Sequence, residues 1–149
     1  MKKIILAMAA ISVFSSNASA CKLNTFDTPL VREVVQQHGG WPISDEKCAV
    51  LNKYNLALFV SGQATVLSNT SIAWTEVKLT LPGLNIVSDK SQTSTYVNTS
   101  NASIATARDI LYEAIRDAIV GLDFEGAAME IRQYQVKAAR QSAASPGKR

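Results

Sequence analysis

The side chains that could carry catalytic chemistry are few and widely spaced. His38 is the only histidine. A hydrolytic site needs such an imidazole beside a carboxylate, and Asp27 and Asp45 are the two acids that we consider as its partners. His38 also stands at the end of a predicted short helix, directly before a pair of glycines, where an imidazole interacts with the helix dipole. This helix-end role explains the residue without catalysis, so we predict no enzyme activity. A small periplasmic hydrolase that uses His38 and a carboxylate is the alternative.

The remaining residue types indicate no metal or cofactor site. A structural zinc site needs a full set of Cys and His ligands, and this chain has one histidine and two cysteines. Asp109, Glu113 and Asp117 recur at helical spacing and could hold a cation. Arg108 and Arg116 interleave with them, which is typical of a solvated, ion-paired helix face. Phosphate-binding loops and nucleophile elbows are missing from the sequence. We therefore expect no cofactor and no metal.

Cys21 and Cys48 are the two cysteines. In an oxidising compartment two such residues are expected to pair, so we predict a Cys21–Cys48 disulfide that ties the N-terminal segment to the start of the first strand. Closing this loop stabilises a fold by about 3 kcal/mol in the chain-entropy model. The alternative for Cys21 is a lipid anchor, which would exclude the disulfide. It is disfavoured because Ala18 stands where the lipoprotein pattern has leucine.

Export is predicted from the first 20 residues. Lys2 and Lys3 precede an apolar run from Ile4 to Phe14, and a polar stretch then ends in Ala18-Ser19-Ala20, which is the three-part layout of a secretory signal peptide. The apolar run is shorter than the roughly 20 residues that span a bilayer, and no later stretch is long enough. We predict a periplasmic or secreted protein without a transmembrane segment.

The rest of the chain is long enough for one domain. We divide the sequence into a signal peptide (1–20), a single domain (21–141) and a disordered tail (142–149). Loss of Lys2 and Lys3 lowers the formal net charge from +3 to +1. The other lysines and arginines form no block in the sequence, so we expect neither nucleic-acid nor anionic-membrane binding.

Hydrophobic spacing predicts the elements that position these residues. Thr28 and Pro29 begin a short helix, which Gly39 ends. Apolar residues alternate with polar ones over 54–67 and again over 73–81, which predicts a long β-hairpin.

A third strand and two helices follow. Residues 84–97 predict a strand whose many hydroxyl side chains suit a sheet edge. A broad apolar stripe over 104–122 predicts a long helix capped by Asn101 or Ser103, and Asp123 caps a last helix. We therefore predict an α+β, two-layer sandwich in which a short N-terminal helix and two C-terminal helices accompany a three-stranded antiparallel sheet.

Phe59 and Trp74 fall on the rows of the hairpin strands that otherwise carry polar residues. A bulge near Thr75, which we favour, turns Trp74 inward, whereas uniform register leaves it on the polar row. If only the helix 104–122 covers the sheet, the row of Phe59 stays open to a partner. We predict a non-catalytic binding protein that engages another protein through this open face or a sheet edge, with Phe59 and Trp74 as candidate interface residues. A self-associating structural component of the envelope is the further alternative.

Overall fold

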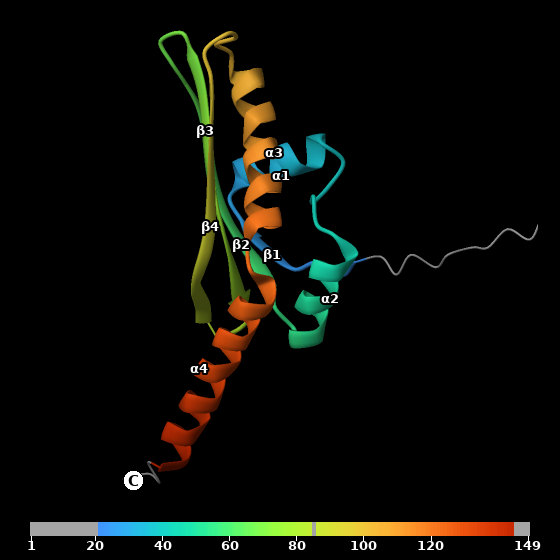
Figure 1. Ribbon diagram of the computed structural model, residues 1–149, viewed down its shortest axis with the longest axis vertical. Coiled ribbons are helices and arrows are strands. Elements are labelled where there is room, and N and C mark those ends of the chain that lie inside the picture. The colour runs from blue at the N-terminus through green and yellow to red at the C-terminus, as the bar shows by residue number, and fades with distance from the viewer. Residues whose placement is uncertain (1–20, 85, 145–149) are drawn as a thin grey trace, which may run out of the picture.

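The computed structural model describes residues 21–84 and 86–144. Within them, a four-stranded sheet carries its helices on one face, so the fold is the predicted α+β, two-layer arrangement (Figure 1). The predicted signal peptide 1–20 lies outside the described residues. The elements in chain order are β1 (Thr25–Asp27), α1 (Pro29–Gln37), α2 (Asp45–Tyr54), β2 (Ala57–Leu67), β3 (Thr70–Leu81), β4 (Ile86–Asn98), α3 (Ile104–Gly121) and α4 (Phe124–Ala144).

The sheet has the order β1-β2-β3-β4. The antiparallel strands β2, β3 and β4 are the three that the sequence predicts. The short strand β1 is an addition: it pairs parallel to β2, with Phe26 opposite Phe59, and makes the sheet mixed. Three residues are too few to show a period, so the sequence alone gives no signal for β1.

The register corrects the expected bulge. Strands β2 and β3 pair without interruption from Ala57 opposite Thr80 to Leu67 opposite Thr70, so the prediction of a bulge near Thr75 is wrong. An irregularity lies instead between β3 and β4, at Lys78 and Thr80. Thr75 stays on the buried row because its hydroxyl donates a 2.8 Å hydrogen bond to the Ser61 carbonyl, which satisfies the polar group inside the core. Trp74 therefore remains on the outer row.

The helix ends follow the predicted caps. The Thr28 hydroxyl accepts a hydrogen bond from the Val31 amide at the start of α1. Ser103, rather than Asn101, caps α3 by accepting from the Thr106 amide at 3.0 Å. Side-chain oxygens in this position satisfy amide groups that have no partner within the helix. Helix α4 continues to Ala144 and so includes the first residues of the predicted tail, while 145–149 lie outside the described residues.

The helix α2 is not predicted by the sequence analysis. It begins after Ser44, whose hydroxyl caps the Lys47 amide, and it ends at Asn55 in left-handed backbone conformation. Cys48 lies on this helix. The Cys21–Cys48 disulfide is present, as predicted, with 5.9 Å between the Cα atoms, but it ties the N-terminal segment to α2 and not to the start of a strand.

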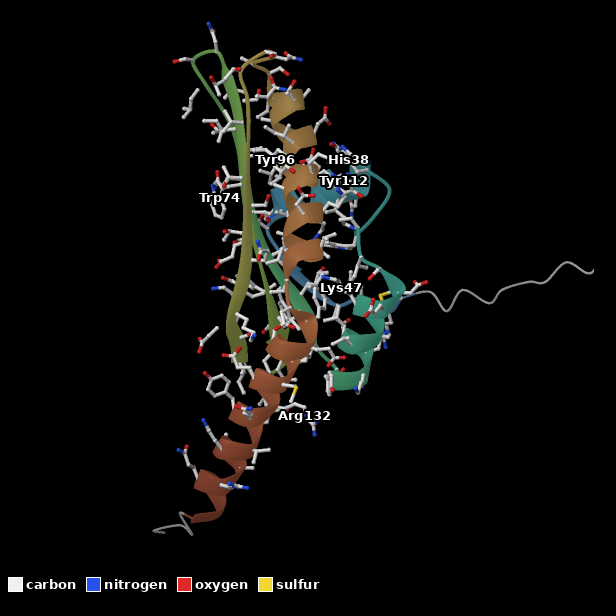
Figure 2. All side chains as sticks on the ribbon, in the orientation of Figure 1. His38, Lys47, Trp74, Tyr96, Tyr112 and Arg132 are labelled. Carbon is white, nitrogen blue, oxygen red and sulfur yellow. A yellow bond between two sulfur atoms is a disulfide. The ribbon has the colours of Figure 1, made fainter. Side chains whose placement is uncertain are left out.

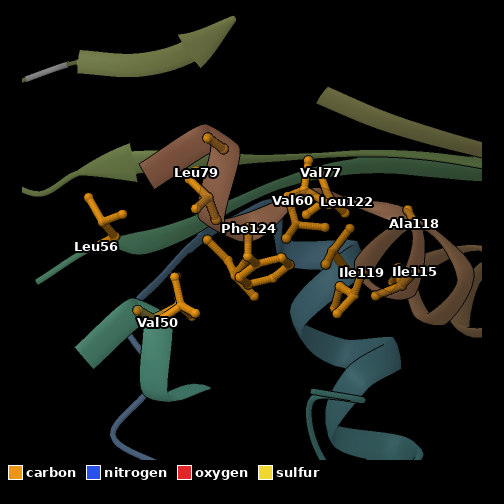
Figure 3. Packing of buried hydrophobic residues seen from close by; sticks show 14 of the residues in the cluster. Val50, Leu56, Val60, Val77, Leu79, Ile115, Ala118, Ile119, Leu122 and Phe124 are labelled. Atoms are coloured by element: carbon orange, nitrogen blue, oxygen red, sulfur yellow. The ribbon is translucent and has the colours of Figure 1, made fainter. Parts of the chain in front are cut away.

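The core lies between the inner face of the sheet and the helices (Figure 3). Helix α3 runs along the sheet over β2, β3 and β4, while α4 packs with its first turns only and then extends past the end of the sheet (Figure 1). The opposite face of the sheet carries none of the described helices (Figure 1). The largest fully buried side chains are Leu51, Leu58, Leu79, Leu111, Ile115, Ile119 and Ile131, and Phe124 lies beside them in the core.

Candidate functional site

The candidate site is the face of the sheet that points away from the helices, which we call the open face. The pairing of the strands sets side chains from neighbouring strands next to one another in rows across it. Its members are Phe26 of β1; Phe59, Ser61, Gln63, Thr65 and Leu67 of β2; Ile72, Trp74, Glu76 and Lys78 of β3; and Ser91, Thr93, Thr95 and Val97 of β4.

Trp74 lies in the middle of the open face and points away from α3 (Figure 2). It is 42% exposed, and its neighbours in the row are Gln63 on β2 and Thr95 on β4. An indole flanked by an amide and a hydroxyl offers apolar contact and hydrogen bonds to the same ligand. The next row adds Ile72, paired with Thr65 and Val97, so the apolar surface continues toward the hairpin turn.

Besides Trp74, the open face carries a pair of aromatic residues near β1. Phe59, which is 37% exposed, stands opposite Phe26 of β1, so the two rings are cross-strand neighbours. A recess of about 280 Å³ opens beside them, where β1 ends at Asp27. From Ser61 onward β1 no longer covers β2, so the outer edge of this strand adjoins the recess. The recess would accept one apolar side chain of a partner.

The base of the recess contains an ion pair. The Asp27 side chain is only 2% exposed, and one of its oxygens lies 2.7 Å from Nη2 of Arg32. The other oxygen accepts a 2.8 Å hydrogen bond from the Thr25 hydroxyl. Both carboxylate oxygens are therefore occupied, and Asp27 fixes the end of β1 against the start of α1 instead of serving an imidazole.

The charges of the open face compensate each other. Its one acidic and one basic side chain, Glu76 and Lys78, form a 3.0 Å ion pair on β3 between the two aromatic groups. The other members are apolar side chains, hydroxyls or an amide. A surface of this composition favours a partner that is held by apolar contacts and neutral hydrogen bonds rather than by charge.

Strand β4 forms the far edge of the sheet. Its segment from Ser91 to Asn98 contains no charged residue and no proline, the two features that commonly protect exposed edges from pairing with other chains. Its inner row is anchored to α3, because the Tyr96 hydroxyl donates a hydrogen bond to Asp117 and this bond raises the pKa of Tyr96. This hydrogen bond joins the β4 edge to α3 on the side of the sheet opposite to the open face.

His38 has other contacts than those considered for catalysis. Its Nδ1 donates to the Val34 carbonyl at 2.9 Å, its Nε2 lies 3.4 Å from Asp109, and its ring stacks on Tyr112 with 4.3 Å between centroids (Figure 2). Among the described residues, neither Asp27 nor Asp45 is one of its hydrogen-bond or ion-pair partners. These contacts join the end of α1 to α3, which is the helix-end role that the sequence favours.

The acidic residues along α3 have basic side chains as partners. Arg116 forms ion pairs with both Glu113 and Asp117, and Asp109 faces His38. In the part of the chain that the structure describes, no group of three or more His, Cys, Asp or Glu side chains is arranged to hold a metal ion. The ion-paired face explains these residues without a cation.

Comparison of the chain with known protein families, with curated proteins and with solved structures gives no match. None of the described helices combines the length and the apolar character that crossing a bilayer requires.

The two candidate interface residues named from the sequence share the open face. Phe59 and Trp74 lie on adjacent strands, two rows apart, and do not pair directly. Phe26 and the recess beside it have no signal in the sequence, because β1 is too short to show a strand period. The regular register of β2 and β3 places Thr75 inside and Trp74 outside. The sequence does not show that the buried Thr75 hydroxyl would be satisfied by the Ser61 carbonyl.

Proposed function

We propose that this chain is an exported, non-catalytic binding protein of the periplasm or the secreted fraction, and that it engages another protein through the open face of its sheet. The observation that carries the proposal is the exposure of Phe26, Phe59 and Trp74 on a face that no helix of the described residues covers. Aromatic side chains surrounded by hydrogen-bonding groups dominate the energetics of many protein interfaces.

Export is supported by two independent features. The three-part layout of residues 1–20 is typical of a signal peptide that is removed during secretion. The Cys21–Cys48 disulfide is typical of proteins that fold in an oxidising compartment. A lipid on Cys21 would require the same sulfur atom, so we propose a soluble mature form that begins at this residue.

The recess beside Phe26 and Phe59 supports a defined partner surface. A residue of the partner that enters it would bury two phenyl rings at once, and each large aromatic buries on the order of 150 Å² or more when fully covered. The neighbouring hydroxyl and amide groups of Ser61, Gln63 and Thr95 would fix the register of the partner by hydrogen bonds.

Site-specific photocrosslinking in the native host tests this proposal. Trp74 is replaced by p-benzoylphenylalanine, and the matched control carries it at Val120, which is 66% exposed on α3. We expect one discrete adduct from position 74 and none of that mass from position 120. The adduct should weaken when Phe59→Ser is added, while circular dichroism shows that the variant stays folded.

The proposal is refuted if position 74 gives no adduct, or gives the same adducts as position 120. It is also refuted if Phe59→Ser destabilises the domain while leaving the adduct from position 74 unchanged, because Phe59 would then serve the fold and not the interface.

Self-association is the second candidate, favoured by the uncharged edge of β4. Two copies could pair antiparallel through residues 91–98 and extend the sheet. Analytical ultracentrifugation of the wild type and of a Thr93→Lys, Thr95→Lys variant distinguishes the two, since lysines on a sheet edge oppose pairing. A concentration-independent monomer refutes this candidate, and an adduct from position 74 with twice the monomer mass supports it.

A further inference from the structure

The second half of α4 is an isolated basic helix. After Glu130, α4 contains three basic residues, Arg132, Lys137 and Arg140, and no acidic one; Lys148 and Arg149 follow in the sequence, outside the described residues. The preceding part, 21–130, has the opposite balance, with eight basic and twelve acidic residues. Such asymmetry between a body and a terminal helix is typical of proteins that contact an anionic surface. This charge asymmetry is not evident as a block in the sequence, because the basic residues are spaced along the helix.

Helical geometry gathers these cations on one side. Met129, Arg132, Gln133, Val136, Lys137 and Arg140 line one shallow groove along α4, which we call the basic stripe. The positions repeat at three and four residues, so they share a face, and this face is opposite to the buried Phe124, Ala128 and Ile131. The basic stripe is therefore directed into solvent.

The stripe combines charge with apolar surface. Met129 is 58% exposed and Val136 is 50% exposed, and the three cations flank them. Met129 and Val136 are not among the buried residues of the core cluster. A helix that places apolar side chains between lysines and arginines suits a lipid interface, where the phosphates meet the cations and the apolar groups enter below them.

Among the described residues, four cations and three acidic side chains lie in and around the stripe, so its balance is positive. Glu125, four residues before Met129 on α4, lies near Lys53. Glu130 is turned toward β4, where it accepts hydrogen bonds from the Ser88 hydroxyl and the Asp89 amide. Asp89 in turn accepts from the Tyr134 hydroxyl at 2.8 Å, and it lines a second recess together with Lys137, whose ammonium lies 5.8 Å from the centroid of the Tyr134 ring. Lys53, at the end of α2, lies over the Tyr54 ring, and Arg132 lies over the same ring. The end of α2 thus adds a further cation beside the stripe.

The position of α4 makes the basic stripe accessible to a flat surface such as a bilayer. Figure 1 shows α4 extending beyond the end of the sheet and away from the other helices. Arg132, in the first part of the stripe, lies over Tyr54 of α2, and the stripe continues from there along the part of α4 that extends away from the body, where a flat lipid surface would reach it. The groove is shallow and Gln133 is its only neutral polar side chain, so it offers few of the directional contacts that recognition of a folded acidic protein needs.

We propose that the basic stripe of α4 binds an anionic phospholipid surface and holds the domain at a membrane, with the open face left accessible. This proposal is independent of the protein partner, because the stripe and the open face share no residue. Each basic side chain near an anionic bilayer strengthens binding by about fivefold at moderate salt. Two exposed apolar groups add only modest affinity, so the association is reversible and sensitive to ionic strength.

Cosedimentation with vesicles tests the proposal on the disulfide-bonded chain 21–149. Phosphatidylcholine vesicles with phosphatidylglycerol should bind the protein, and pure phosphatidylcholine vesicles should not. The variant Arg132→Gln, Lys137→Gln, Arg140→Gln should lose roughly a hundredfold in binding, the product of three such factors. The matched control Lys22→Gln, Lys78→Gln, Arg116→Gln removes the same charge elsewhere and should keep most of the binding.

A second variant tests the apolar part. Met129→Gln with Val136→Gln leaves every charge in place and should weaken binding that persists at raised salt. The proposal is overturned if anionic vesicles bind no better than neutral ones, or if the control variant loses as much as the stripe variant. Binding to soluble poly-glutamate without binding to vesicles would overturn the lipid assignment in favour of an acidic protein. All the replaced side chains are exposed or partly exposed, and circular dichroism checks that each variant is folded.

Discussion

Lys47 connects two helices that are far apart in the sequence. It lies on α2, and its ammonium group reaches the C-terminal end of α3 (Figure 2). There Nζ donates hydrogen bonds to the carbonyls of Ile119 at 2.6 Å, Val120 at 2.8 Å and Leu122 at 3.1 Å. It also lies 4.6 Å from the centroid of the Phe124 ring. One side chain thus supplies the end of α3 with a cap that its own sequence lacks.

The replacement Lys47→Met removes the donor and keeps the apolar stem. A hydrogen bond from a charged group contributes about 1.5 to 3 kcal/mol, and a cation at a helix C-terminus up to about 2 kcal/mol. These contributions overlap, and burial offsets part of them, because desolvation of the ammonium lowers the pKa of Lys47. We therefore expect a net loss of about 2 kcal/mol in the free energy of unfolding. For a domain of this size that corresponds to a melting temperature lower by roughly 8 °C.

Thermal and urea unfolding of the disulfide-bonded protein at neutral pH measures this loss. The matched control is Lys53→Met, on the same helix, whose side chain is exposed with its ammonium over the Tyr54 ring, and which should change the melting temperature by at most about 2 °C. A Lys47→Met variant as stable as the wild type would refute the reasoning. An equal loss from Lys53→Met would show that charge on α2, and not the contact with α3, is what matters.

Three further predictions concern the disulfide, a buried glycine and a helix cap. Intact mass of the protein isolated from its host should correspond to a chain that begins at Cys21 and lacks two hydrogens. Cys48→Ser should reduce stability by about 3 kcal/mol in chemical unfolding, and a mass that retains Met1 or carries acyl chains would contradict the expectation. Gly62→Ala should cost about 1 to 3 kcal/mol, since a Cβ at this position would meet the Trp74 carbonyl at 2.9 Å and Leu111 Cδ1 at 3.1 Å; an unchanged urea midpoint would show that α3 moves aside freely. Hydrogen bonds from the Gly126 amide and Lys90 lower the pKa of Asp123 in the folded protein, so its carboxylate stabilises the fold above the ordinary aspartate pKa and loses this effect as the pH falls through the lowered value. Asp123→Ala should therefore melt below the wild type at neutral pH, and the difference should shrink below about pH 4; a difference that is constant with pH would exclude this carboxylate as the cause.

The sequence by itself determined the elements whose signals are local. Three helix starts are predicted by N-cap residues whose side-chain oxygens accept hydrogen bonds from backbone amides three residues later: Thr28, Ser103 and Asp123. Alternation of apolar residues predicts β2 and β3, because successive side chains of a strand point to opposite faces. The same alternation sets Phe59 apart from the core side chains on β2, and the cysteine count predicts the disulfide.

Only the tertiary structure decided the features that depend on contacts between distant residues. The strand β1 exists because it pairs with β2, and Trp74 stays outward because Thr75 finds the Ser61 carbonyl across the strand pair. Lys47 caps a helix more than 70 positions away. The basic stripe depends on α4 continuing beyond the sheet. These features depend on segments that come into contact only when the chain folds. The hydrophobic periodicity within one segment therefore cannot predict them.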